Sequence, residues 1–174
     1  MRLTVGSKMS YPSQGPCLLG AVVKKVVAGT LLNFYQLELL DESGGELFVP
    51  VDKAQTSGLR LLIKRTEIPK LLERLTQSVG TVKDWKQRAN DNVKRLMSGS
   101  AFDLAEVIDS LTGLSETKEL SLREQWILSK ARRLLVSEIA EVLKSTRTAA
   151  EEQVDQALSA RETAKLPKAQ AGSH

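Results

Sequence analysis

The sequence contains a single histidine, His174, which is the last residue. This scarcity excludes the common histidine-dependent chemistry: a Ser-His-Asp triad, a Cys-His pair and a histidine-based metal site. Cysteine is equally rare, because Cys17 is the only one, so the chain can form neither an internal disulfide nor a cysteine-rich zinc site. We therefore expect no catalytic residue, no metal and no cofactor, and interpret the protein as a non-enzyme.

Long hydrophobic runs are also missing. No stretch of about 18 apolar residues exists to span a membrane, and residues 1–6 lack the features of a signal peptide. Hydrophobic residues make up 41% of the chain and charged residues 26%, which is typical of a soluble globular protein. We expect a cytoplasmic protein with no membrane partner.

The first part of the chain, residues 1–64, has the pattern of a small β domain. Short apolar runs rich in β-branched residues alternate with turn signals, of which the strongest is the hairpin loop at residues 41–45. Gly20 interrupts the longest run and predicts a bend there. Five short strands in so few residues favour a strongly bent barrel. The expected strands cover residues 8–11, 17–28, 31–40, 46–51 and 59–63.

The second part, residues 66–165, has the pattern of a helical domain. Apolar residues recur at helical spacing in about five segments, and Ser100, Ser121 and Thr148 are expected to cap three of them. The fold class is therefore α+β with two domains. Residues 166–174 are expected to be a disordered tail, in which Gly172-Ser173-His174 resembles the start of an affinity tag.

The segment at residues 83–88 carries the most distinctive chemistry. Trp85 stands at the expected start of a helix, with Lys83, Lys86 and Arg88 around it, although aromatic residues are only 4% of the chain. Residues 83–95 hold five cations against two acids, a net charge of +3. Cations that hold phosphates, beside a ring that stacks on a base, are a pattern of nucleic-acid binding. A solvated helix face explains such a run of cations equally well.

A structural interpretation of Trp85 remains open on spacing alone. Trp85, Ala89, Val93 and Leu96 share one apolar helix face, so the ring can equally belong to the core. The second tryptophan, Trp126, lies among apolar residues of the longest expected helix, which favours packing between helices.

Several short segments follow one another in a specific order and spacing over about 160 of the 174 residues. In the β part they are Val5-Gly6, Tyr11-Pro12, Gly15, Gly29, Val49-Pro50-Val51 and Gly58-Leu59-Arg60. In the helical part they are Trp85-x-x-Arg88, Ser98-Gly99, Ala105-Glu106-Val107, Leu111, Leu120-Ser121-x-x-Glu124, Ala131-Arg132-x-Leu134-Leu135 and Glu138-x-Ala140. Together these segments resemble the CarD/CdnL family of bacterial transcription regulators that bind RNA polymerase.

The resemblance implies a Tudor-like N-terminal domain that docks on the β subunit of RNA polymerase by edge-strand contact, with Lys25, Phe48, Val49 and Pro50 at the contact. It also implies that Trp85 enters the minor groove of promoter DNA at the upstream edge of the melted bubble. There the tryptophan stabilises the open complex, at promoters such as those of rRNA, without reading sequence. The DNA-contacting residues would be Trp85, Arg88, Lys86 and Lys83.

Two positions depart from the family pattern. Some members carry arginine where Phe48 stands, and some carry a basic residue where Asn90 stands. We therefore expect a more apolar polymerase contact and a weaker DNA contact. The expected state is a monomer, associated with the bacterial nucleoid through the polymerase. The alternative is an adaptor that binds polymerase or a repair factor without touching DNA.

Overall fold

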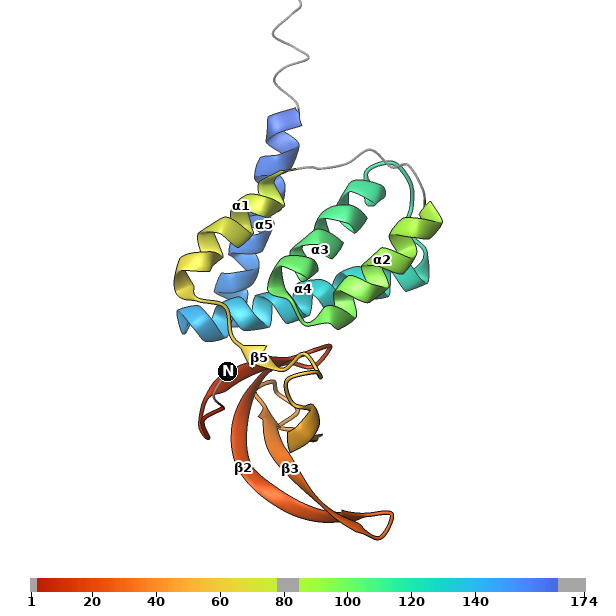
Figure 1. The fold of residues 1–174 in the computed structure, drawn as a ribbon. Coiled ribbons are helices and arrows are strands. Elements are labelled where there is room, and N and C mark those ends of the chain that lie inside the picture. Colours follow the sequence, from red (N-terminus) through yellow and green to blue (C-terminus); the bar gives the residue numbers. More distant parts are fainter. Residues whose placement is uncertain (1–2, 78–84, 166–174) are drawn as a thin grey trace, which may run out of the picture.

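The computed structural model describes the backbone of residues 3–77 and 85–165, and the side chains of residues 3–77 and 88–161. Strands form one end of the molecule and helices the other (Figure 1). We call the strands β1–β5 the β module and the helices α1–α5 the helical module. The predicted α+β fold, with a bent five-stranded part followed by five helices in the described residues, is confirmed.

The β module is one antiparallel sheet with the strand order β4-β3-β2-β1-β5. The strands are β1 (Lys8–Tyr11), β2 (Gly15–Val27), β3 (Thr30–Leu39), β4 (Glu46–Pro50) and β5 (Arg60–Leu61). Within the described residues, β4 and β5 are therefore the two edges of the sheet. A short 3₁₀ turn, η1 (Val51–Lys53), follows β4.

The predicted bend at Gly20 is present. The pairing of β2 with β3 shifts register between Leu19 and Val22. A Cβ atom on Gly20 would lie 2.8 Å from the carbonyl oxygen of Gln36, so only glycine allows the strands to approach this closely. Beyond the bend the two strands continue together as a long hairpin that leaves the core (Figure 1).

A small apolar core fills the concave side of the β module. Cys17 is fully buried in it, and burial raises the pKa of its thiol to about 11. The thiol is therefore protonated at neutral pH and packs as a small apolar side chain. The core consists of Met9, Cys17, Leu19, Leu37, Val49, Ala54 and Leu59.

The described residues of the helical module form five helices, in agreement with the predicted number. They are α1 (Ile68–Thr76), preceded by the 3₁₀ turn η2 (Arg65–Glu67), α2 (Trp85–Ser98), α3 (Ala101–Ser115), α4 (Leu122–Leu143) and α5 (Arg147–Lys165). Ser100 caps α3, and Ser121 with Glu124 forms the predicted capping box of α4. The predicted cap at Thr148 is wrong. The Thr146 hydroxyl accepts the hydrogen bond from the Ala149 N–H instead, because α5 begins one residue before Thr148.

A buried ion-pair network ties three helices together. Asp109 on α3 accepts hydrogen bonds from Arg161 on α5, at 2.5 Å, and from Arg74 on α1, at 3.2 Å. Arg74 also donates two hydrogen bonds to Glu106, at 2.6 and 2.7 Å. Asp109 and Arg161 are both buried, so each depends on the other for its compensating charge.

A second ion pair, in which only the carboxylate is buried, joins the two modules. Arg60, the first residue of β5, donates two hydrogen bonds to Glu138 on α4, at 3.0 and 2.7 Å. The Glu138 carboxylate, only 1% exposed, also accepts the Ile63 N–H at 3.1 Å. The Arg60 Nε atom donates to the Gly99 carbonyl between α2 and α3. One guanidinium therefore links the sheet to α4 and to the α2–α3 turn.

A close backbone contact completes this junction. Pro12 lies against two glycines with positive φ, Gly58 in the β module and Gly99 in the helical module. A Cβ atom would lie 2.6 Å from the Pro12 ring if built on Gly58, and 2.9 Å if built on Gly99. Larger residues would separate the modules here, so the glycines allow the approach.

Asp109→Ala removes the carboxylate that pairs with Arg161 and leaves that guanidinium buried with its main charge partner missing. We expect the free energy of unfolding to fall by about 3–5 kcal/mol, measured by urea denaturation. Asp155→Ala is the matched control, because Asp155 pairs with Arg132 at the surface and should cost less than about 1 kcal/mol. Equal losses for the two variants would contradict this interpretation of the network.

Candidate functional site

Of the four predicted polymerase-contacting residues, Phe48, Val49 and Pro50 belong to the edge strand β4, and Lys25 belongs to β2. Phe34 pairs with Pro50, Gln36 pairs with Phe48, and Lys25 pairs with Leu32. Because directly paired residues, and residues two apart along a strand, point to the same side of a sheet, Lys25, Phe48 and Pro50 share one face. We call this face the docking face.

Lys25 and Phe48 are in direct contact on the docking face. The Lys25 ammonium lies 3.2 Å from the centre of the Phe48 ring, a cation–π contact. Phe48 is 37% exposed, so the ring can still pack against a partner. The fourth predicted residue, Val49, points to the opposite side and is buried in the core, so only its backbone can take part in an edge contact.

The hairpin that extends from this face was not identified from the sequence as a binding element. Its tip, with Ala28 and Gly29 at positive φ, leaves apolar side chains of β2 and β3 exposed on both sides. The available signal was the continuous β-branched run of β2, which is apolar where a half-solvated strand would alternate. The exposed apolar residues are Val22, Val26, Val27, Leu31 and Leu32.

Three of the four predicted DNA-contacting residues, Trp85, Lys86 and Arg88, belong to the first turn of α2. Trp85 is the first residue of α2. Lys83 and the side chains of Trp85 and Lys86 lie outside the described residues. Arg88 is partly exposed and lines a cavity between α2, α3 and α4, together with Arg123 from the first turn of α4.

The basic residues of α2 do not form one continuous face. Arg88 and Arg95 are two turns apart on the same side of the helix, whereas Lys94 lies about 100° around the helix axis from Arg95. Among the α2 side chains that the structure describes, those of Asn92 and Leu96 are buried. Ala89, predicted to belong to the apolar stripe, is exposed, so the buried face is rotated relative to the predicted one.

The packing prediction for Trp126 is wrong. Its side chain is 58% exposed on the outer face of α4, one turn after the exposed Leu122. The Lys130 ammonium lies 5.2 Å from the Trp126 ring centre. The core stripe of α4 runs through Ile127 and Ala131 instead, about a quarter turn or more away from Trp126.

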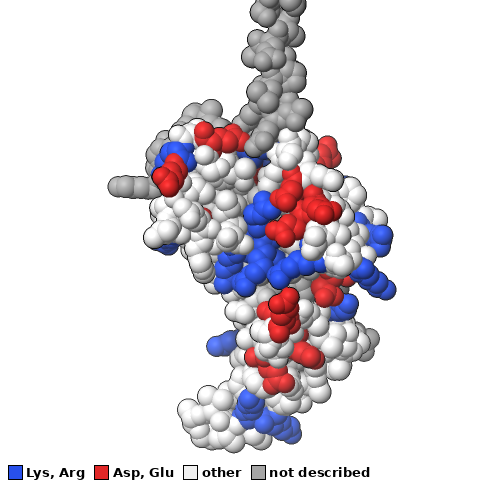
Figure 2. Space-filling view, turned by 180° about the vertical axis from the view of Figure 1, so that it is seen from behind, with Lys and Arg blue, Asp and Glu red and all other residues white. Residues whose placement is uncertain are grey.

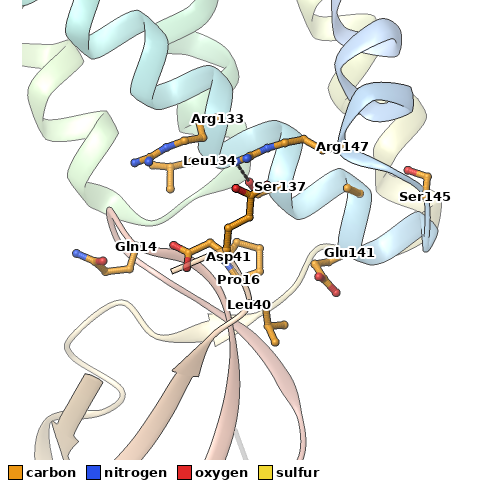
Figure 3. A pocket seen from close by; sticks show the side chains of 12 residues that line it. Gln14, Pro16, Leu40, Asp41, Arg133, Leu134, Ser137, Glu141, Ser145 and Arg147 are labelled. Carbon is orange, nitrogen blue, oxygen red and sulfur yellow. Dashed lines mark hydrogen bonds between the residues drawn. The ribbon is translucent and has the colours of Figure 1, made fainter. Parts of the chain in front are cut away.

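A pocket of about 220 Å³ lies at the seam between the modules (Figure 3). Arg133 and Arg147 enter it from the helical module, and Asp41 enters it from the β module. Arg147 donates a hydrogen bond to the Ser137 hydroxyl at 3.1 Å. The Ser43 hydroxyl and, further away, the Arg133 charge lower the pKa of Asp41. Because charges of both signs face each other here, the pocket has no preference for one charge.

Charges are unevenly distributed over the back of the molecule (Figure 2). Basic side chains gather where the helical module meets the β module, and acidic side chains follow below them on the β module. Within the described residues, no group of three or more metal-ligating side chains comes together, and none of the helices is long and apolar enough to cross a membrane.

Comparison with known proteins identifies the helical module. Residues 70–155 match the family described as CarD, C-terminal domain. This match and the fold define a transcription regulator. The chain belongs to the CarD family.

Two individual proteins are similar to this chain. YdeB of Bacillus subtilis (strain 168), a candidate transcription factor, is 23% identical over 141 residues, which cover 80% of this chain and 91% of YdeB. The solution NMR structure of the 72-residue N-terminal domain of Myxococcus xanthus CarD is 37% identical, with a TM-score of 0.29. The match covers 34% of this chain and 79% of that domain.

Proposed function

We propose that the protein docks on the β subunit of RNA polymerase through its docking face and stabilises the promoter open complex through Trp85. One observation carries the proposal: the docking face and the start of α2 belong to different modules, and the bidentate Arg60–Glu138 pair joins these modules to each other. A polymerase-bound β module then determines where Trp85 meets the DNA.

The docking contact has an apolar centre and an open strand edge. Phe48 supplies exposed aromatic area, and Lys25 supplies a charge that an acidic partner residue can pair with. The outer edge of β4 has no strand partner among the described residues, so a partner strand can extend the sheet there.

The DNA contact depends on attachment to the polymerase. A few phosphate contacts from residues such as Arg88 give weak, salt-sensitive affinity without sequence preference. Attachment to the polymerase raises the local concentration of α2 at the promoter, so weak contacts suffice. A ring that contacts only the distorted junction favours the melted state over the duplex by that difference in binding.

Trp85→Ala should shorten the lifetime of the open complex by about tenfold, because an aromatic contact to one base contributes roughly 1–3 kcal/mol. The lifetime is measured by competitor challenge on a promoter with an unstable open complex. Trp126→Ala is the matched control and should leave the lifetime unchanged. Equal lifetimes for wild type and a folded, polymerase-bound Trp85→Ala would exclude the tryptophan mechanism and favour the adaptor.

The double variant Lys25→Ala/Phe48→Ala should weaken binding to core RNA polymerase by about 30-fold or more, because buried aromatic contacts dominate interface energies. A pull-down or a binding titration with purified polymerase measures the loss. Leu61→Ala removes an exposed apolar side chain from the other edge strand and should have no effect. Wild-type binding by the double variant would exclude the docking face as the polymerase contact.

A further inference from the structure

A cavity of about 180 Å³ opens between α2, α3 and α4, at the end of the helical module where α2 begins. Only Arg88 of its lining belongs to the proposed DNA contact. The remaining lining combines apolar side chains, a buried carboxamide and a second arginine. The residues that carry the argument are Asn92, Ser110, Leu111, Leu114, Arg123 and Ile127.

Asn92 is the unusual member of this lining. Its side chain is only 3% exposed, and its amide nitrogen donates one long hydrogen bond, of 3.4 Å, to the Ser110 hydroxyl. Its carbonyl oxygen has no hydrogen-bond partner in the described part of the chain. An unsatisfied buried amide oxygen costs about 1–3 kcal/mol, so a group that binds in the cavity and donates a hydrogen bond to this oxygen gains free energy of that order.

The volume and the apolar part of the lining are compatible with a ring. Leu111, Leu114 and Ile127 are buried and contribute apolar walls. An enclosed apolar cavity of about 150 Å³ accepts a benzene-sized molecule, so the volume here is sufficient for one ring. A ring that also carries an N–H donor at its edge satisfies both the apolar walls and the Asn92 oxygen, and nucleobases are rings of this type.

The charges at the cavity favour an anion attached to that ring. Arg88 and Arg123 both line the cavity. Among the described residues, no carboxylate forms an ion pair with either arginine within 4 Å. The single acid of the lining, Glu124, accepts the Ser121 N–H in the capping box and lies 3.8 Å from Lys118. The capping bond lowers the pKa of Glu124, so the acid stays ionised, and the lining keeps one net positive charge.

We propose that this cavity binds a nucleotide, with the base against Asn92 and the phosphate near Arg88 and Arg123. The inference rests on the proposed function, because Trp85 precedes Asn92 by about two turns of α2, so an unstacked base at the DNA junction lies within reach. Extruding a base costs a few kcal/mol, least where the strand is already melted. A cavity that binds the extruded base, but no base of the intact duplex, favours the melted junction, as proposed for the tryptophan.

The test uses the full chain and a fork-junction DNA with 5-fluoro-2′-deoxyuridine as the first unpaired base. On binding wild type, the ¹⁹F resonance should lose its H₂O/D₂O shift difference, because the ring leaves water. Asn92→Leu should retain that shift difference and bind the fork roughly tenfold more weakly. Its melting temperature should not fall, because the substitution removes an unsatisfied buried polar group.

Arg123→Gln is the second variant, because Arg123 is exposed and its replacement leaves the core intact. It should weaken fork binding more than Lys130→Gln, which removes an equal charge from the same helix outside the cavity. A titration with thymidine 5′-monophosphate, followed by the NMR chemical shifts of the Ser110 and Leu114 backbone amides, identifies the source of the nucleotide. Saturation by the free nucleotide at the concentration where the fork saturates indicates a soluble ligand, and saturation by the fork alone indicates DNA.

The proposal would be overturned if the base stays hydrated on wild type and if Asn92→Leu and Arg123→Gln both bind the fork like wild type. The cavity would then hold only water. Trp85→Ala in the same assay separates this failure from failure of the proposed function. If Trp85→Ala still weakens fork binding, only the nucleotide cavity is excluded. If it binds like wild type as well, the DNA contact itself is excluded.

Discussion

The bidentate ion pair between Arg60 and Glu138 is the contact on which the arrangement of the molecule depends. Each module has its own apolar core, so neither core fixes the angle between them. The ion pair constrains it together with the contact of Pro12 with Gly58 and Gly99, because the same carboxylate also accepts the Ile63 N–H and the same guanidinium also reaches the Gly99 carbonyl. An isolated buried ion pair contributes little net stability, but removing one partner is costly. The pair therefore favours this one arrangement of the modules over others more than it stabilises the fold.

This junction holds two different surfaces, the docking face and the start of α2, at a set distance from each other. The docking face is apolar at its centre and lies beside an open strand edge, which suits a protein partner. The start of α2 combines arginines with a cavity that has a polar, unsatisfied wall, which suits a strand of nucleic acid. A rigid connection lets a strong contact at the first surface position weak contacts at the second.

The elements could be predicted because their signals are local. Turn residues, the bend at Gly20 and the caps at Ser100 and Ser121 act within a few positions of each other. Trp126 was misassigned because apolar neighbours in sequence occupy different helix faces. The junction could not be predicted, since Pro12, Gly58, Arg60, Gly99 and Glu138 are far apart in sequence and meet only in the folded chain. These positions belong to the segments that carried the family resemblance, and the junction supplies a physical reason for them.

The most direct test of the central claim is the lifetime of the open complex with Glu138→Gln at saturating concentration. This variant removes the charge that holds Arg60 while keeping the shape of the side chain. If fixed geometry couples the two surfaces, polymerase affinity stays at the wild-type value and the lifetime falls toward that of polymerase alone. Residual dipolar couplings confirm that the angle between the modules has loosened. A wild-type lifetime with a loosened junction would contradict the account.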